Sequence, residues 1–213
     1  MKTEDLVSVL ATGVEAIDPK RTARRHLLAI TGGLLGALGL TGGILRLNPM
    51  LSYLVVEPMF WIRETYCAAL ALLGFAAVTR LARPGIRLGF VPVGVVTVVM
   101  VMWIFAATVL LRAPAQNRSH LFFGATAAVC PFLIALVGVP LFIAILWVLR
   151  GLAPTRLRLA GAAAGFAAGS LGALVYSLHC PELAAPFLGT WYLLGMLIPT
   201  SLGAWLGPRL MRW

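Results

Sequence analysis

Six separate stretches of this chain are apolar enough, and close to long enough, to cross a lipid bilayer as helices. They are Leu27–Leu45, Thr65–Ala82, Leu88–Leu111, Leu121–Leu149, Leu159–Leu178 and Leu183–Leu206. A helix needs about 20 mostly apolar residues to cross the hydrocarbon core. Apolar residues make up 61% of the 213 positions and charged residues only 11%, a balance that excludes a soluble fold of this size. The sequence therefore predicts an all-α, polytopic membrane protein with a bundle of six transmembrane helices.

Two of the six stretches have uncertain limits. The fourth is too long for one crossing, so we expect the crossing to be Pro131–Leu149 and Ser119–Val129 to form a shallower helix at the membrane surface. The second stretch is the weakest, and we begin it at Thr65 because Arg63 and Glu64 directly precede it. The sequence places both charged residues at the membrane edge, outside the helix.

Glycines four residues apart lie on one face of a helix and let a neighbouring backbone approach closely. The fifth stretch carries Gly161, Gly165 and Gly169, and the first carries the pairs Gly32/Gly36 and Gly39/Gly43. We expect both groups to form packing faces inside the bundle.

Basic residues outnumber acidic residues by 17 to 7, which gives a formal net charge of +10. With six crossings both chain ends lie on one side, and that side holds 13 of the basic residues; the other four are Arg46, Arg63, Arg112 and Arg118. Because basic residues collect on the cytoplasmic side, both termini are predicted to be cytoplasmic. The basic residues stand in short groups and form no run that would follow a phosphate backbone, so no direct nucleic-acid binding is expected.

Residues 1–26 precede the first stretch and form the expected cytoplasmic segment, whereas residues 27–213 form the membrane domain. Thr3 is placed to cap a short helix, with Glu4 and Asp5 in its first turn. Apolar residues then recur at helical spacing, at Leu6, Val9, Leu10, Val14 and Ile17. This amphipathic helix packs either on the membrane or in a groove of a soluble partner; its acidic start disfavours an anionic leaflet.

Three cysteines, Cys67, Cys130 and Cys180, are the main candidates for chemistry. Cys130 and Cys180 each precede a proline at the outer boundary of a predicted span, so both thiols are expected at a similar depth. Three interpretations stay open for this pair: a disulfide, a site for a soft metal ion with His179 nearby, or two buried apolar side chains. The predicted spans contain no HExxH or GxSxG motif and no charge near a bilayer centre, so an enzyme is not expected.

Several short motifs in order along the chain add a resemblance to a known family. They are Met1–Leu6 (MKTEDL), Leu81–Gly85 (LARPG), Leu149–Pro154 (LRGLAP), Leu178–Glu182 (LHCPE), Trp191–Tyr192 and Gly207–Trp213 (GPRLMRW), with the glycine-rich fifth stretch. In this combination the chain resembles NrsF-type proteins, negative regulators of sigma F, which are six-span anti-sigma factors of the bacterial inner membrane. The resemblance implies that the N-terminal segment holds an extracytoplasmic-function sigma factor inactive. It also implies that two outward-facing cysteines, matching Cys130 and Cys180, sense metal or oxidative stress, while Cys67 lies outside the pattern.

We therefore expect a membrane-bound anti-sigma factor whose partners are an extracytoplasmic-function sigma factor and the lipid bilayer. No cofactor is required in this interpretation, and a heavy-metal ion enters only as a candidate signal. Two alternatives remain: a small transporter or metal-efflux component, and a membrane redox protein that uses Cys130 and Cys180 with a quinone. The first predicts flux through a polar path, and the second predicts catalytic turnover of the thiols.

Overall fold

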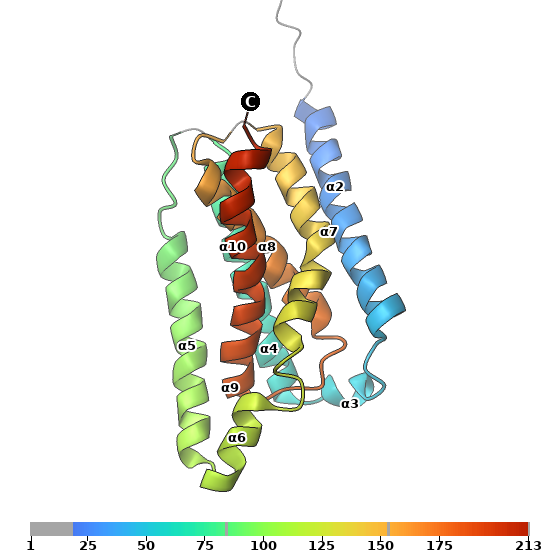
Figure 1. Ribbon diagram of the computed structural model, residues 1–213, viewed down its shortest axis with the longest axis vertical. Helices are drawn as coiled ribbons and strands as arrows, with labels where there is room; N and C mark the ends of the chain where they lie inside the picture. The colour runs from blue at the N-terminus through green and yellow to red at the C-terminus, as the bar shows by residue number, and fades with distance from the viewer. Residues whose placement is uncertain (1–18, 84, 153, 213) are drawn as a thin grey trace, which may run out of the picture.

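A computed structural model describes residues 19–83, 85–152 and 154–212, and over these residues the chain is helical without strands (Figure 1). In chain order the elements are α2 (Pro19–Gly39), the π-helical turn η1 (Leu40–Leu45), α3 (Leu51–Leu54), α4 (Pro58–Leu81), α5 (Val91–Arg112), α6 (Ala115–Phe123), α7 (Cys130–Arg150), α8 (Leu157–Tyr176), α9 (Ala185–Phe187), the π-helical turn η2 (Leu188–Tyr192) and α10 (Leu193–Leu210).

Six of the described helical segments are long and apolar enough to cross a membrane, judged by length and composition. They confirm the predicted order of six apolar helices, with two shifted limits. Cys130 opens α7, one residue before the expected start at Pro131. The separate short helix before it is Ala115–Phe123 and not Ser119–Val129, because Gly124, with a positive φ, ends it and residues 124–129 form turns. The second helix begins at Pro58, seven residues before Thr65, because a proline at the first helical turn starts a helix readily.

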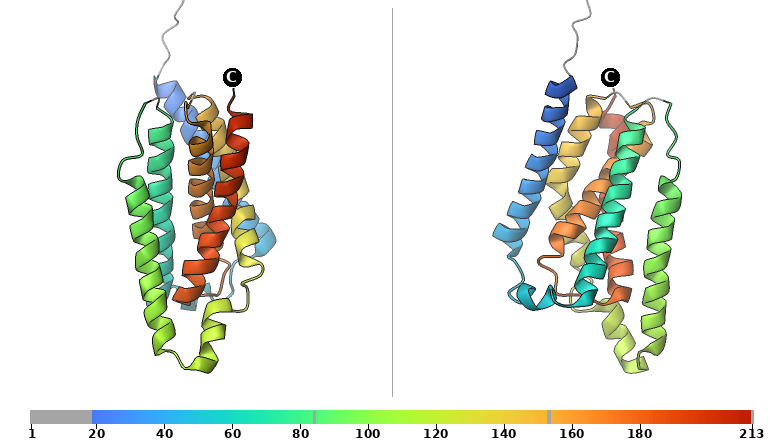
Figure 2. Two further views of the ribbon diagram at one scale, coloured as in Figure 1. Left: turned by 60° about the vertical axis from the view of Figure 1, so that its left-hand side comes forward. Right: turned by 180° about the vertical axis from the view of Figure 1, so that it is seen from behind.

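Helix α8 lies at the centre of the bundle, packed against α4, α7 and α10 (Figures 1 and 2). Its glycines allow this position, as predicted. A Cβ atom on Gly161 would collide with the Gly203 carbonyl, and one on Gly165 would collide with the Pro199 carbonyl, both in α10. A Cβ on Gly169 would lie 2.9 Å from the Met196 Cα atom. The close approach of α8 and α10 therefore requires residues without side chains.

The glycines of α2 and η1 behave differently from those of α8. Gly36 faces α7, where a Cβ would lie 3.0 Å from Pro140 Cβ, but a Cβ added to Gly32, Gly39 or Gly43 would meet no neighbour within 4 Å. Gly33 contributes instead, facing the Pro140 carbonyl at 3.1 Å. The predicted pairs are therefore wrong for this helix, because α2 lies at the edge of the bundle and touches mainly one neighbour, α7.

The described part of the chain has two unlike ends. The start of α2, the α4–α5 and α7–α8 connections and the end of α10 lie together at what we call the C-terminal end (Figure 1). The α8–α9 connection, α3 and α6 lie at the other end, which we call the thiol end because it holds Cys180. All three acidic residues of the described part, Glu57, Glu64 and Glu182, belong to the thiol end.

Candidate functional site

The candidate site is the connection between α8 and α9, residues 177–184, which we call the Cys180 loop. It leaves α8 with two further helix-like hydrogen bonds, from the N–H groups of His179 and Cys180 to the Tyr176 carbonyl, at 2.9 and 3.1 Å. Pro181 follows and ends this turn, since proline has no N–H to continue it. The sequence therefore places the Cys180 thiol at the point where the chain turns away from α8.

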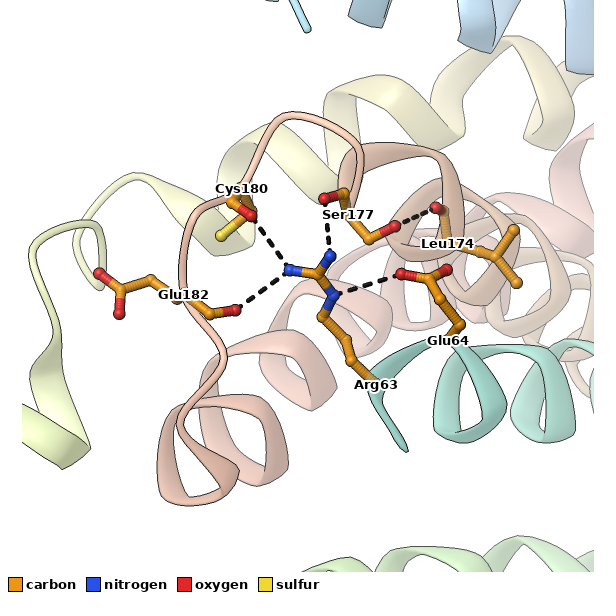
Figure 3. Close-up of polar contacts among 6 residues, drawn as sticks. All are labelled: Arg63, Glu64, Leu174, Ser177, Cys180 and Glu182. Atoms are coloured by element: carbon orange, nitrogen blue, oxygen red, sulfur yellow. Dashed lines mark hydrogen bonds and ion pairs between the residues drawn. The ribbon is translucent and has the colours of Figure 1, made fainter. Parts of the chain in front are cut away.

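A buried arginine on α4 holds this loop (Figure 3). Arg63 Nη1 donates hydrogen bonds to the carbonyl oxygens of Cys180, at 3.0 Å, and Glu182, at 3.1 Å. Its Nη2 donates to the Ser177 carbonyl at 2.9 Å, and its Nε lies 3.3 Å from Oε1 of Glu64. One guanidinium group therefore fixes three carbonyls of the loop while a neighbouring carboxylate balances its charge.

The position of Arg63 corrects the sequence interpretation, which placed this residue at the membrane edge before the second span. The side chain is completely buried in the second turn of α4, and the Phe60 ring lies 5.0 Å below its guanidinium carbon. A buried charge is tolerated when its donors are all satisfied. Here the three carbonyl acceptors are more than 110 positions away along the chain, so a local hydropathy pattern contains no sign of them.

Two further elements contact the Cys180 loop. The Glu182 carboxylate accepts a hydrogen bond of 2.7 Å from the N–H of Ala125, in the turn between α6 and α7. Gly124 has a positive φ of 52°, and a Cβ there would lie 2.6 Å from the Glu182 carboxyl carbon, so this turn fits glycine alone. On the opposite side the N–H of Asn48 donates to the Leu178 carbonyl at 3.0 Å. The loop thus connects α4, the segment after η1 and the turn before α7.

The structure brings Cys130 and Cys180 together, as their predicted depth suggested. Helices α7 and α8 touch at Gly138 and Gly172, where a Cβ on Gly172 would lie 2.8 Å from the Gly138 nitrogen. Cys130 precedes this contact by the same number of residues as Cys180 follows it, so two antiparallel chains bring both thiols to one level. Both are fully buried free thiols. The two thiols lie next to each other, and the Tyr176 hydroxyl lies beside both.

The surroundings of Cys180 favour its thiolate form. The hydrogen bond with Cys130 lowers the pKa of the Cys180 thiol below its ordinary value, against the opposing effect of burial. The backbone N–H of Glu182, the Tyr192 hydroxyl and the positive charge of Arg63 lower this pKa further. Because a thiolate is the nucleophile and metal ligand, Cys180 is the more reactive thiol of the pair.

This arrangement predicts a specific pH dependence. Thiolate absorbance of the purified protein, followed from pH 5 to 9, should rise at a lower pH than for an ordinary cysteine, and Cys180→Ser should remove that step. Cys130→Ala should move the step to higher pH, because alanine has no donor and takes away the largest cause of the lowered pKa. A titration unchanged by Cys130→Ala would contradict the effect of the Cys130 thiol on Cys180.

The other predicted sensing residues lie apart from this pair. The His179 ring is directed to the segment after η1, where its Nδ1 donates to the Arg46 carbonyl at 2.8 Å. No group of three histidine, cysteine or acidic side chains arranged to hold a metal ion occurs among the residues that the structure describes. The metal ligands available at this site are therefore the two thiols. Cys67 is buried on α4 in the same apolar cluster as the pair.

Sequence reasoning missed two residues of the site besides Arg63. Tyr176 precedes Cys180 by one helical turn, a spacing that was visible in the sequence but is equally typical of ordinary apolar packing. Tyr192 lies in η2, and its fully buried hydroxyl has no well-formed hydrogen-bond partner although it lies beside Cys180. Together the two tyrosines surround the thiols with hydroxyl groups inside an otherwise apolar cluster.

The predicted sigma-binding residues lie outside the part of the chain that the structure describes. They are Thr3, Glu4, Asp5, Leu6, Val9, Leu10, Val14 and Ile17. The described chain begins at Pro19, in the first turn of α2, at the C-terminal end of the bundle.

The described residues thus define a class: an all-α protein with six membrane-length apolar helices and a buried thiol pair beside a loop held by an arginine. A model of the family described as "Negative regulator of sigma F" matches residues 10–213, and the chain belongs to this family. It is 47% identical over 213 residues to the "Probable anti-sigma-F factor NrsF" of Azospira oryzae, covering 100% of both chains. It is 39% identical over 220 residues to the "Anti-sigma-F factor NrsF" of Caulobacter vibrioides, again covering 100% of both. No solved structure matches this chain.

These relatives are named as regulators, which confirms the expectation that the chain is not an enzyme. The resemblance inferred from the short sequence motifs is likewise confirmed over nearly the whole length.

Proposed function

We propose that this protein is an anti-sigma factor of the bacterial cytoplasmic membrane that holds an extracytoplasmic-function sigma factor through residues 1–26. A change at Cys130 and Cys180, by metal binding or disulfide formation, releases the sigma factor. The family membership supports the regulatory role. The observation that supports the sensing mechanism is the contact between two buried thiols, one of which, Cys180, has a lowered pKa and lies in a loop fixed to three other elements.

The helices offer a route from the thiols to the N-terminal segment. Cys130 is the first residue of α7, and α7 packs along α2 where Gly33 and Gly36 meet Pro140. The N-terminal segment continues directly into α2. A metal ion or a disulfide that draws the two thiols together would shift the start of α7, and α2 rests on that helix. Such a signal releases the partner only if the sigma factor binds the two arrangements with different affinity.

The proposed orientation places the thiol end outside the cytoplasm. Basic residues support it, because the described arginines of the thiol end are few and are accompanied by all three described acidic residues. A reporter active only outside the cytoplasm should be active when fused after Asn48, Asn117 or Glu182, and silent after Pro84, Pro154 or Trp213. A single reversed fusion would contradict the six-crossing topology, most directly at the second or fourth crossing.

Partner binding is tested by two substitutions in the N-terminal segment. Leu6→Asp together with Leu10→Asp would place two charges on the best-defined apolar face of the expected helix. Burying unpaired charge is costly enough to abolish a micromolar contact, for which the binding free energy is about −8 kcal/mol. We expect co-purification of the sigma factor to be lost while the protein inserts normally into the membrane.

The matched control adds the same charge to the opposite face of that helix. Ser8→Asp together with Thr12→Asp should leave the sigma factor bound, because these positions lie about half a turn away from Leu6 and Leu10. Retained binding in the Leu6/Leu10 variant, or equal loss in the Ser8/Thr12 variant, would show that this face is not the docking surface.

A further inference from the structure

A hollow of about 780 Å³ lies between α8 and α10 at the C-terminal end of the bundle. Its rim carries three exposed arginines, Arg158 at the start of α8 and Arg209 and Arg212 at the end of α10. Its volume falls within the range of about 300–1,000 Å³ that is typical of ligand sites. The thiol pair lies at the opposite end, so this hollow is separate from the candidate sensing site.

The charge of this hollow is not balanced by the described part of the chain. The described acidic residues, Glu57, Glu64 and Glu182, all belong to the thiol end. Arg209 stacks on the Trp205 ring, with its guanidinium carbon 4.2 Å from the ring centre, and donates a hydrogen bond to the Trp205 carbonyl at 3.0 Å. Three arginines therefore line one hollow at an end of the bundle that holds no described acidic residue, a distribution of charge that favours an anion.

Beyond the arginines, the hollow extends as a groove along α10. Ser201, Ala204 and Pro208 recur at helical spacing on one face, and their small side chains leave the groove open. The groove runs for about 10 Å at a rise of about 1.5 Å per residue. Trp205 lines it and is 60% exposed, as is typical of tryptophan at a membrane–water interface.

We propose that this hollow binds the headgroup of an anionic phospholipid, with the phosphate at Arg158, Arg209 and Arg212 and the start of an acyl chain along the groove. Arginine matches phosphate geometry with paired donors, and basic pockets between transmembrane helices recognise acidic headgroups. A soluble anion would leave the apolar groove empty, whereas a lipid would fill both the arginine-lined part of the hollow and the groove. Lipid binding itself needs only the bilayer; its assignment to the cytoplasmic leaflet rests on the proposed function.

The test uses the purified full-length protein in a neutral detergent, without a sigma factor and without a thiol reagent. Phosphatidylglycerol or phosphatidylcholine with identical acyl chains is titrated in, and bound lipid is counted by native mass spectrometry while the unfolding temperature is recorded. Inorganic phosphate at the same concentration serves as the soluble anion. Variant Arg158→Gln/Arg209→Gln/Arg212→Gln is compared with Arg83→Gln/Arg87→Gln/Arg150→Gln, which removes the same charge from the same end outside the hollow.

The wild-type protein should bind and be stabilised by phosphatidylglycerol in preference to phosphatidylcholine and to phosphate. The variant that lacks the three arginines of the hollow should lose about a hundredfold in apparent affinity for phosphatidylglycerol, at about 1 kcal/mol for each arginine. The control variant should lose little. Equal affinity of the two variants, or stabilisation by phosphate alone, would overturn the lipid site. These measurements are independent of the N-terminal segment and of the thiols, so failure here leaves the proposed function standing.

Discussion

Cells that carry Cys130→Ser or Cys180→Ser are expected to keep the sigma factor inactive and to lose its release after a thiophilic metal or an oxidant is added. Serine preserves the size of each side chain but removes most affinity for soft metals and all capacity for a disulfide. Since a disulfide, or a metal ion held by two thiolates, needs both sulfur atoms, loss of one disables the pair. Sigma-dependent transcription should fall from full induction to the uninduced level in either variant, and the double variant should be no worse.

Cys67→Ser provides the matched control for this result. Cys67 is a buried thiol of the same apolar cluster, but it lies on α4 rather than at the junction of α7 and the Cys180 loop. Cys67→Ser also removes one buried sulfur atom, but it should leave the induction of sigma-dependent transcription largely intact. A normal response in the Cys130/Cys180 double variant would remove the thiols from the mechanism, and equal loss in Cys67→Ser would indicate a general packing defect.

Variants of the same thiols also distinguish a regulator from the two alternative functions, a redox enzyme and a transporter. A redox enzyme would turn over its thiols with an electron acceptor, whereas a sensor needs one change per signal. A transporter would require a polar path, but the buried charge found among the described residues, Arg63, binds loop carbonyls near one end of the bundle. Retention of the sigma factor by a variant that no longer responds would fit regulation and neither alternative.

The general architecture follows from features that are local in the sequence. The length of each apolar stretch predicts a helix, and the glycines of α8 predict the close approach to α10 because a four-residue spacing defines one helix face. The same rule failed for α2, where the spacing is present but neighbours are few. Periodicity defines a face but does not state whether another helix lies against it.

The candidate site was only partly predictable, because its contacts join distant parts of the chain. Equal depth of Cys130 and Cys180 followed from two prolines at span boundaries, but their contact depends on the meeting of Gly138 and Gly172. Arg63 was misplaced because hydropathy treats a charge as unfavourable whatever its partners are. The carbonyls that satisfy it belong to a loop whose path is set by tertiary structure.

Arg63→Met is expected to release the Cys180 loop and to destabilise the protein by about 3–5 kcal/mol, the usual effect of breaking a buried charged network. Methionine fills similar space but leaves three buried carbonyls without their donor. For a chain of this size the unfolding temperature should fall by about 10 °C. Arg112→Met is the matched control, because Arg112 is an exposed arginine at the end of α5 and its loss should have little effect.

The decisive readout for Arg63 is the accessibility of Cys180, since a purely structural loss elsewhere would not alter it at low temperature. In a background with Cys67→Ser and Cys130→Ser, the fully buried Cys180 should react slowly with a maleimide, and Arg63→Met should raise that rate at least about tenfold by opening the loop. Arg63→Lys should lie between the two, because one ammonium group keeps the charge but cannot match the geometry of three carbonyls. Under the proposed mechanism the ordered loop belongs to the state that holds the sigma factor, so the same loosening in cells should raise sigma-dependent transcription without a signal. Unchanged labelling together with an unchanged unfolding temperature would show that the loop is held by its other contacts, to Ala125 and Asn48, and that Arg63 is dispensable.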